Sequence, residues 1–405
     1  MPHDLRTSEI IYQELVRGKS QFRVGWGKLT APLLGIVLVL PAACGGRAAA
    51  VASPSASPSA APSVAPSPSP SLAPTASETL APPTAAPTPT PPSRALRDLG
   101  PGETLRLLSE FHIPRSGFAV SMAFSPVQPV LYHAGVGREI QGYDFEAEQM
   151  VFQIQGFQDA PLVLAVSASG DRIVAEDGPA LGIWDLSTSE RIGSLQMPAI
   201  FTPLNAGFVA AEAFFADDES GNLALWETAR WEEVARLAYL GRSDGGFVLP
   251  RGEAVVMLIR GREELSLVDW SGQLIRAIPL GAQPWRLHGI SPQGERALLH
   301  VDVGLGSEGV LITDLAGGGT AIRFPLLNIR AIAVSADWRT LAIADAAELL
   351  RLFDPSTGEP FFTQPLDAFQ IRGLTVSPDG ALLGVYLRRE GEEGGWIQIW
   401  GRDLP

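Results

Sequence analysis

The chain has 405 residues with 46% hydrophobic and 18% charged side chains, and its single cysteine excludes an intramolecular disulfide or a cysteine-rich zinc site. Its formal net charge is −14, but residues 95–405 alone hold 23 Lys and Arg against 40 Asp and Glu, a balance of −17. This acidity argues against nucleic-acid binding and favours basic or neutral partners, and the lack of lysine beyond Lys28 excludes Schiff-base chemistry in that part.

Residues 1–43 have the order of an export signal. Basic side chains end at Lys28, an apolar run covers 29–43, and the run ends in the small residues Pro41, Ala42 and Ala43. Its 15 residues are fewer than the ~20 that a membrane-spanning helix needs. We therefore expect an export signal rather than a permanent membrane span.

Cys44 directly follows these small residues, and the segment resembles the precursor of a bacterial lipoprotein. The resemblance implies that Cys44 is the lipid attachment site, which would place the protein on the outer face of the cytoplasmic membrane or at the cell surface. The match departs from the family pattern at Leu40, which lies four residues before the cysteine instead of three. The alternative is an ordinary signal that is cleaved nearby, with the protein secreted.

Residues 44–94 combine this cysteine with a Pro/Ser/Ala/Thr-rich stretch. The part from 47 to 94 holds 13 of the 34 prolines, in patterns such as the run 66–70. Proline disfavours helix and sheet, and the lack of large apolar side chains prevents a core. The composition predicts a disordered, extended linker between anchor and domain.

Residues 95–405 repeat with a period of 40 to 47 residues. Within one period four short β-rich runs are readable, at 163–166, 172–175, 181–184 and 191–195, which is the content of a propeller blade. Each unit ends on an equivalent position, and there are seven: Asp144, Asp185, Glu227, Asp269, Asp314, Asp354 and Gly401.

The ends of three units, 183–185, 225–227 and 399–400, carry tryptophan at one shared position. On these residues the domain resembles a degenerate member of the WD-repeat β-propellers, although the family's Gly-His pair is missing from every unit. The last unit stops after its third strand, and an unassigned strand precedes the first unit at 104–108. We predict an all-β, seven-bladed propeller that closes when this strand completes the last blade.

Residues that recur at the same position in several repeat units are predicted to have structural roles. Tryptophans at one repeat position favour packing between blades, and acids at the end of the third strand favour turn formation by accepting backbone N–H groups. The acidic stretch 217–222 falls where a hairpin must turn and does not fit a calcium-loop spacing. We expect no metal or cofactor. The structural residues are Asp144, Trp184, Asp185, Trp226, Asp269, Asp314, Asp354 and Trp400.

The connections that lead into each unit's first strand are rich in aromatic and Arg side chains. In a propeller these connections gather on one face, and this composition is typical of binding hot spots. The alternative is that several of the aromatics cap blade cores. The candidate partner-binding residues are His112, Arg115, Phe157, Phe201, Trp285, Arg286, Arg330, Phe369 and Arg372.

The sequence shows no Gly-x-Ser-x-Gly elbow and no metal-binding histidine spacing, so we expect a monomeric, non-catalytic binding or scaffold propeller with a protein, peptide or glycan partner. The alternative is a propeller-type enzyme, a lactonase or glycan-acting hydrolase, with acids and His112 or His288 at the mouth of the central channel.

Overall fold

A computed structural model describes the chain between residues 95 and 402. The described ranges are 95–99, 103–114, 121–135, 137–157, 160–161, 164–178, 180–196, 203–210, 213–218, 220–238, 242–304, 307–317, 321–326, 328–366 and 370–402. The predicted export signal 1–43, the linker 44–94 and Cys44 lie outside them. Among the described residues, no helix has the length and apolar character needed to cross a membrane.

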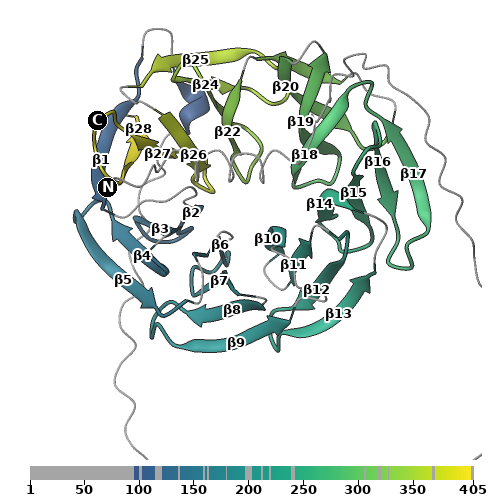
Figure 1. Cartoon of the computed structure of the whole chain (residues 1–405), viewed down its shortest axis with the longest axis horizontal. Helices are drawn as coiled ribbons and strands as arrows, with labels where there is room; N and C mark the ends of the chain where they lie inside the picture. The colour runs from purple at the N-terminus through teal and green to yellow at the C-terminus, as the bar shows by residue number, and fades with distance from the viewer. Residues whose placement is uncertain are drawn as a thin grey trace, which may run out of the picture. The chain divides into compact units, whose positions relative to one another are not determined.

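The described residues form seven four-stranded antiparallel sheets, arranged as blades in a ring, whose centre we call the central channel (Figure 1). The predicted seven-bladed propeller is confirmed. Blade 1 contains β2 (Ser121–Phe124), β3 (Val130–Gly135), β4 (Glu139–Asp144) and β5 (Gln149–Gln155); blade 2 contains β6 (Leu164–Val166), β7 (Arg172–Asp177), β8 (Ala180–Asp185) and β9 (Arg191–Gln196); blade 3 contains β10 (Pro203–Ala210), β11 (Ala213–Asp218), β12 (Leu223–Glu227) and β13 (Glu232–Leu237).

The remaining blades repeat this order. Blade 4 contains β14 (Ser243–Val248), β15 (Val255–Ile259), β16 (Glu264–Val268) and β17 (Leu274–Pro279); blade 5 contains β18 (Gln283–Ile290), β19 (Arg296–Gly304), β20 (Ser307–Asp314) and β21 (Ile322–Pro325); blade 6 contains β22 (Ile329–Val334), β23 (Leu341–Asp345), β24 (Leu349–Phe353) and β25 (Pro360–Pro365); blade 7 contains β26 (Gln370–Val376), β27 (Leu382–Arg388), β28 (Gly395–Gly401) and β1 (Arg106–Ile113).

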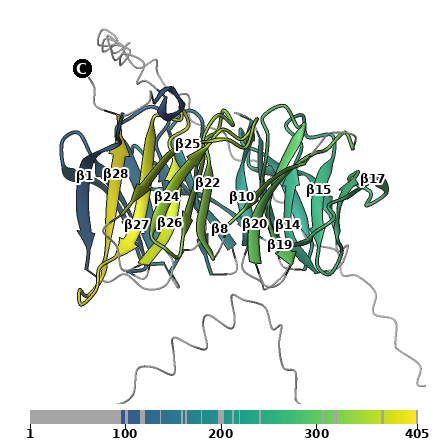
Figure 2. The ribbon, with the colours of Figure 1, turned by 90° about the horizontal axis from the view of Figure 1, so that it is seen from above.

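The ring closes through β1, as the sequence predicts. This strand pairs antiparallel with β28, from Arg106 opposite Gly401 to Ile113 opposite Gly395, and the two lie side by side in Figure 2. The strand is longer than the expected 104–108. Closure pairs the edge of β28 that would otherwise lack a neighbouring strand.

A short 3-10 helix, η1 (Leu96–Asp98), adds a second contact to blade 7. The backbone N–H of Leu96 donates to the Gly380 carbonyl at 2.8 Å, and its side chain is fully buried in a cluster with Leu105 and residues of blades 6 and 7. The folded domain therefore includes residues upstream of β1.

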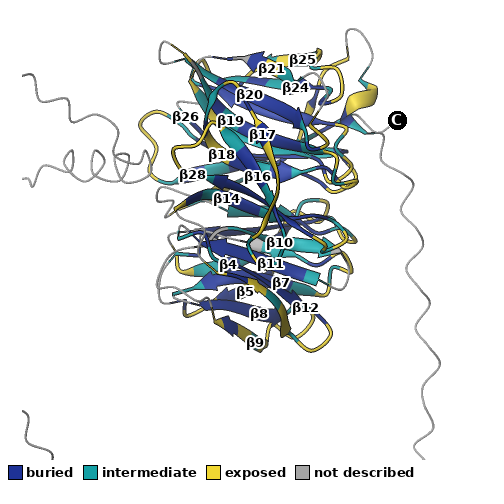
Figure 3. Cartoon of the chain, turned by 90° about the vertical axis from the view of Figure 1, so that its right-hand side faces the viewer, coloured by how far each residue is buried: buried dark blue, intermediate teal, exposed yellow. Residues whose placement is uncertain are grey.

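The core consists of apolar clusters, most of them between neighbouring blades, and Figure 3 shows the buried residues along the strands. Trp184 packs in the cluster of blades 1 and 2, Trp226 in that of blades 2 and 3, and Trp400 against that of blades 6 and 7. The shared tryptophan position is thus a packing position between blades.

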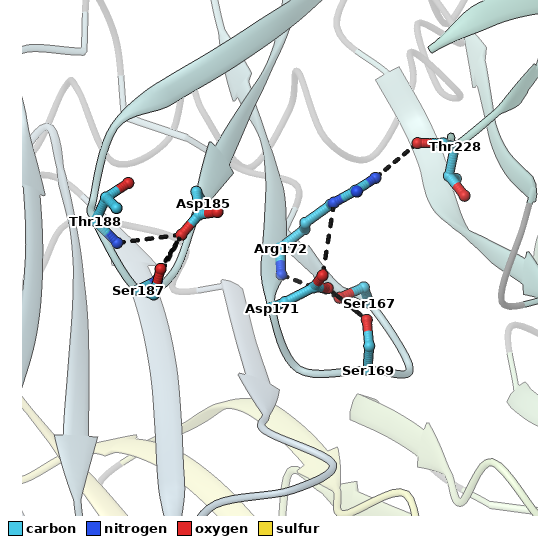
Figure 4. A network of polar contacts seen from close by, with 8 residues as sticks. All are labelled: Ser167, Ser169, Asp171, Arg172, Asp185, Ser187, Thr188 and Thr228. Atoms are coloured by element: carbon cyan, nitrogen blue, oxygen red, sulfur yellow. Dashed lines mark hydrogen bonds and ion pairs between the residues drawn. The ribbon is translucent and has the colours of Figure 1, made fainter. Parts of the chain in front are cut away.

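Polar contacts organise the turns. Asp185 accepts the backbone N–H groups of Ser187 and Thr188 at 2.8 and 3.1 Å (Figure 4). The side chains of Asp144, Asp269, Asp314 and Asp354 each accept at least one backbone N–H in the equivalent turn.

Some polar contacts join blades. The Arg172 guanidinium of blade 2 donates to the Thr228 carbonyl of blade 3 at 2.6 Å (Figure 4).

The strand order decides which loops share a face. Because successive strands alternate in direction, the connection into a blade's first strand lies at the same end as the hairpin between its second and third strands. We call this end of the ring the connection face. Any binding surface built from blade-to-blade connections would lie there.

Candidate functional site

The first strand of each blade is the innermost one and borders the central channel (Figure 1). Most side chains on these inner strands are buried or half-buried between blades. Of the inner-strand residues whose side chains the structure describes, three are exposed: Trp285, Arg286 and Arg330. These three exposed side chains therefore lie at the inner end of their blades, near the start of the inner strands.

Irregular strand pairing changes the side-chain alternation on the inner strands of blades 3 to 7. The register with the second strand shifts near the connection face in each of these blades, which is the effect of a β-bulge. The residues left out of register include Trp285, Arg330 and Arg372, on β18, β22 and β26. A bulge lets these side chains leave the usual alternation between the two faces of the sheet.

Trp285 is the largest of these side chains, with 40% of its surface exposed. Its ring packs edge-on against His300 of β19, with 4.9 Å between the ring centroids. The His300 Nε2 lies 3.5 Å from the Glu308 Oε2, so the indole rests on a fixed support. A rigid, exposed indole of this kind suits the docking of an apolar group.

Arg286 is exposed to the channel, yet protein surrounds it closely enough that burial lowers its pKa. Its charge acts on Asp217, a fully buried residue at the end of β11. Burial raises the pKa of Asp217 to about 7, against the opposing effects of Asn205, Gly246 and Arg286. Arginine itself keeps its proton in proteins, so the channel wall carries a permanent positive charge here.

Asp217 also links two blades. Its Oδ1 accepts the backbone N–H of Asn205 at 2.6 Å, and its Oδ2 accepts that of Gly246, in the next blade, at 2.5 Å. Two other acids join neighbouring blades in the same way. The Glu308 Oε2 accepts the Ile329 N–H at 2.7 Å, and the Glu348 Oε2 accepts the Ile371 N–H at 3.2 Å.

His288 lies on the same inner strand as Trp285 and Arg286. Burial, followed by the charges of Arg286 and His300, lowers its pKa well below the usual value, so the ring is neutral at neutral pH. Within the described residues its buried Nε2 atom has no hydrogen-bond partner. This leaves one polar group beside Arg286 that could take part in a further hydrogen bond.

The structure corrects the placement of four candidates on the connections. Trp285, Arg286, Arg330 and Arg372 lie within the inner strands β18, β22 and β26, because each strand extends through a bulge. They reach the channel wall rather than the loops above it. Arg115, Phe201 and Phe369 lie outside the described residues.

His112 is misplaced by the sequence interpretation. It belongs to β1, the outermost strand of blade 7, so it lies at the rim and not at the channel mouth. Its Nε2 lies 2.9 Å from the Glu393 carbonyl oxygen, and its ring centroid lies 4.9 Å from that of Trp396. Both contacts belong to the closure of the ring.

Phe157 is also corrected, because it is 5% exposed and packs on Trp184 with 5.0 Å between the ring centroids. The alternative role, capping a blade core, fits this residue. A shallow groove of about 400 Å³ lies beside it between blades 1 and 2. Arg191 occupies this groove, 5.5 Å from the Trp184 ring and 2.7 Å from an Asp177 oxygen.

The described residues of the stretch 217–222 lie at the hairpin between β11 and β12, where Asp218 accepts the backbone N–H groups of Ser220 and Asn222 at 2.9 and 3.0 Å. In the described part of the chain, no group of three His, Cys, Asp or Glu side chains is arranged to hold a metal ion. No local sequence pattern indicates the roles of Asp217, Glu308 and Glu348, because each has a partner in the next blade.

Neither a protein-family model nor a curated protein sequence matches the chain. Solved structures match its fold. Hydrazine synthase of Kuenenia stuttgartiensis aligns with a TM-score of 0.58 and 13% identity, over 72% of this chain and 97% of that chain. The Cps50 (Swd1) β-propeller domain of Myceliophteria thermophila aligns with a TM-score of 0.58 and 15% identity, over 74% of this chain and all of that one. These likenesses establish a β-propeller fold and no more.

Proposed function

We propose that this protein is a non-catalytic binding or scaffold propeller, exported and anchored through a lipid on Cys44, whose connection face and channel mouth dock a protein, peptide or glycan partner. The observation that carries the proposal is Trp285. An aromatic side chain on an innermost strand could be buried between blades, yet 40% of it is exposed beside the guanidinium of Arg286. Tryptophan and arginine are the side chains most enriched in binding hot spots.

The acids near the channel support binding over catalysis. Asp217 and Glu348 have raised pKa values because of burial, which is a property of catalytic acids. They belong to blades 3 and 6, and each accepts a backbone N–H from the next blade. Each carboxylate therefore has a structural partner in the next blade, which supports a structural role for these acids.

The proposal can be tested by proximity labelling on intact cells, with the labelling enzyme fused to the full chain. The variant W285A/R286Q/R372Q removes the exposed indole and two channel arginines. The matched control is Ile192→Ala, which truncates a side chain that is 48% exposed on the outer strand of blade 2. We expect the triple variant to lose the proteins or glycoconjugates that the wild type labels, and the control to retain them. Unchanged labelling by the triple variant, with its fold intact by circular dichroism, would refute a partner site here.

The proposed lipid anchor on Cys44 is tested separately. Mass spectrometry of the exported protein should find a mature N-terminus at Cys44 that carries acyl chains, since two chains are needed for durable membrane attachment. An unmodified N-terminus, or one that begins after Cys44, would refute lipidation and leave a secreted protein.

A further inference from the structure

Three arginines occupy one repeat position on three adjacent blades. Each lies five residues before the serine that opens the turn between the first and second strands, and that serine accepts a backbone N–H within the turn in every case. The arginines are Arg286, Arg330 and Arg372, preceding Ser291, Ser335 and Ser377, and the equivalent position of blade 4 holds Asp244.

The register shift near the start of the inner strand leaves one residue unpaired with the second strand: Trp285 in blade 5, Arg330 in blade 6 and Arg372 in blade 7. Arg286 directly follows this position and pairs with His300. Arg286 and Arg330 are exposed and Arg372 is half-buried. Figure 1 shows their strands, β18, β22 and β26, following one another around one side of the ring. They give one side of the channel mouth a cationic wall in a domain that otherwise carries a large negative charge.

The acids near this wall are recessed behind it. Asp217 is fully buried, the Glu308 side chain is 15% exposed, and Glu348 is half-buried. Each uses a carboxylate oxygen to accept a backbone N–H of the next blade's inner strand. The charges of Arg286 and Arg330 act on Asp217 and Glu348, and both arginines keep exposed surface.

From this arrangement, and resting on the proposed function, we propose that the channel mouth over blades 5 to 7 binds an acidic peptide segment of a partner protein. Carboxylates on the segment would pair with Arg286, Arg330 and Arg372, since the planar guanidinium matches a carboxylate in two parallel hydrogen bonds. An apolar residue of the same segment would pack on the exposed face of Trp285. The combination of an indole with several arginines fits a peptide that alternates acidic and apolar side chains. The overall acidity of the domain would repel such a segment elsewhere on the surface.

The test is fluorescence anisotropy with the full chain and a synthetic peptide of alternating Glu and Phe, labelled with fluorescein. A second peptide carries Gln in place of every Glu. We expect the acidic peptide to bind at least about tenfold more tightly than the amide peptide, with affinity falling as salt rises. R330Q and R372Q should each weaken binding about fivefold or more. R351Q is the matched control, because Arg351 lies on β24, two strands from β22, and pairs with Asp345 of β23 at 2.9 Å.

Three results would overturn the inference. These are equal affinity for the two peptides, equal loss of affinity in R351Q and the channel variants, and stronger arginine-dependent binding of an oligogalacturonate than of the peptide. The charge of Arg286 acts on buried Asp217, so R286Q also tests the stability of the fold. If the melting temperature of R286Q falls, the affinity of R330Q, which changes an exposed side chain, is the result that tests the inference. If no peptide binds while cell-surface labelling still depends on Trp285, the proposed function stands and the acidic-peptide inference fails. If labelling is also independent of Trp285, both fail.

Discussion

Replacement of Leu96 by alanine tests where the propeller begins. The Leu96 side chain has no exposed surface and packs with Leu105 among residues of blades 6 and 7. Truncation of a fully buried leucine to alanine removes transfer free energy and leaves a cavity, a loss of about 2–5 kcal/mol. The backbone bond from Leu96 to the Gly380 carbonyl is retained in the variant, so the loss measures side-chain packing alone.

The assay is urea unfolding of the full chain, followed by tryptophan fluorescence and circular dichroism. The matched control is Leu107→Ala, because Leu107 lies nearby on β1 but is 38% exposed, and its truncation should cost under about 1 kcal/mol. We expect the unfolding midpoint of L96A to fall well below those of the wild type and L107A, with an unchanged slope. If L96A and L107A unfold together, residues 95–99 do not belong to the folded domain, and the reasoning is wrong.

Two further predictions concern acids with partners inside the fold, half-buried Glu110 and buried Asp217. Glu110→Gln should lower the free energy of unfolding in urea by about 1–3 kcal/mol, because the Glu110 Oε2 accepts hydrogen bonds from both Arg389 and Gln398 at 2.6 Å. Glu103→Gln is the control and should cost less, since the Glu103 side chain is 48% exposed. Equal losses in the two variants would contradict the prediction. Asp217 has a pKa raised to about 7, so the folded state retains a proton that the unfolded chain releases above pH ~4, and its contribution to stability is lost as pH rises from about 4 to 7, by at most about 1.4 kcal/mol per unit. Asp217→Asn removes this titration, so the free-energy difference between wild type and variant should decline over that range; a flat difference would contradict the raised pKa.

The blade count and the ring closure could be predicted from sequence because both depend on patterns repeated along the chain. The four strands of blade 2 were expected at 163–166, 172–175, 181–184 and 191–195, and each has its counterpart in β6 to β9. The ring closure could be predicted because the last unit lacked a fourth strand and an unassigned strand preceded the first. The error on His112 arose at this same place, since β1 extends to Ile113 and carries that residue to the rim.

The candidate site was harder to predict because its geometry depends on bulges and on other blades. A period-two pattern assigns every strand residue to one of two faces, and it does not reveal that a shifted register aims Trp285 or Arg330 at the channel. Asp217 was interpreted only as part of a hairpin. Its partner Gly246 lies 29 residues further along the chain, and no local signal indicates that contact.

The links between blades have a consequence for the proposed site. Glu308 holds the N-terminal end of β22 and Glu348 holds that of β26, so the inner strands that carry Arg330 and Arg372 are each fixed by the preceding blade. No single blade contains the arginines or the supports that orient them. The cationic wall therefore requires at least blades 5 to 7 to be packed in sequence around the ring. Blade 7 in turn is complete only when β1 pairs with β28, so a change that opens the closure should weaken ligand binding through Arg372 before it affects Arg286.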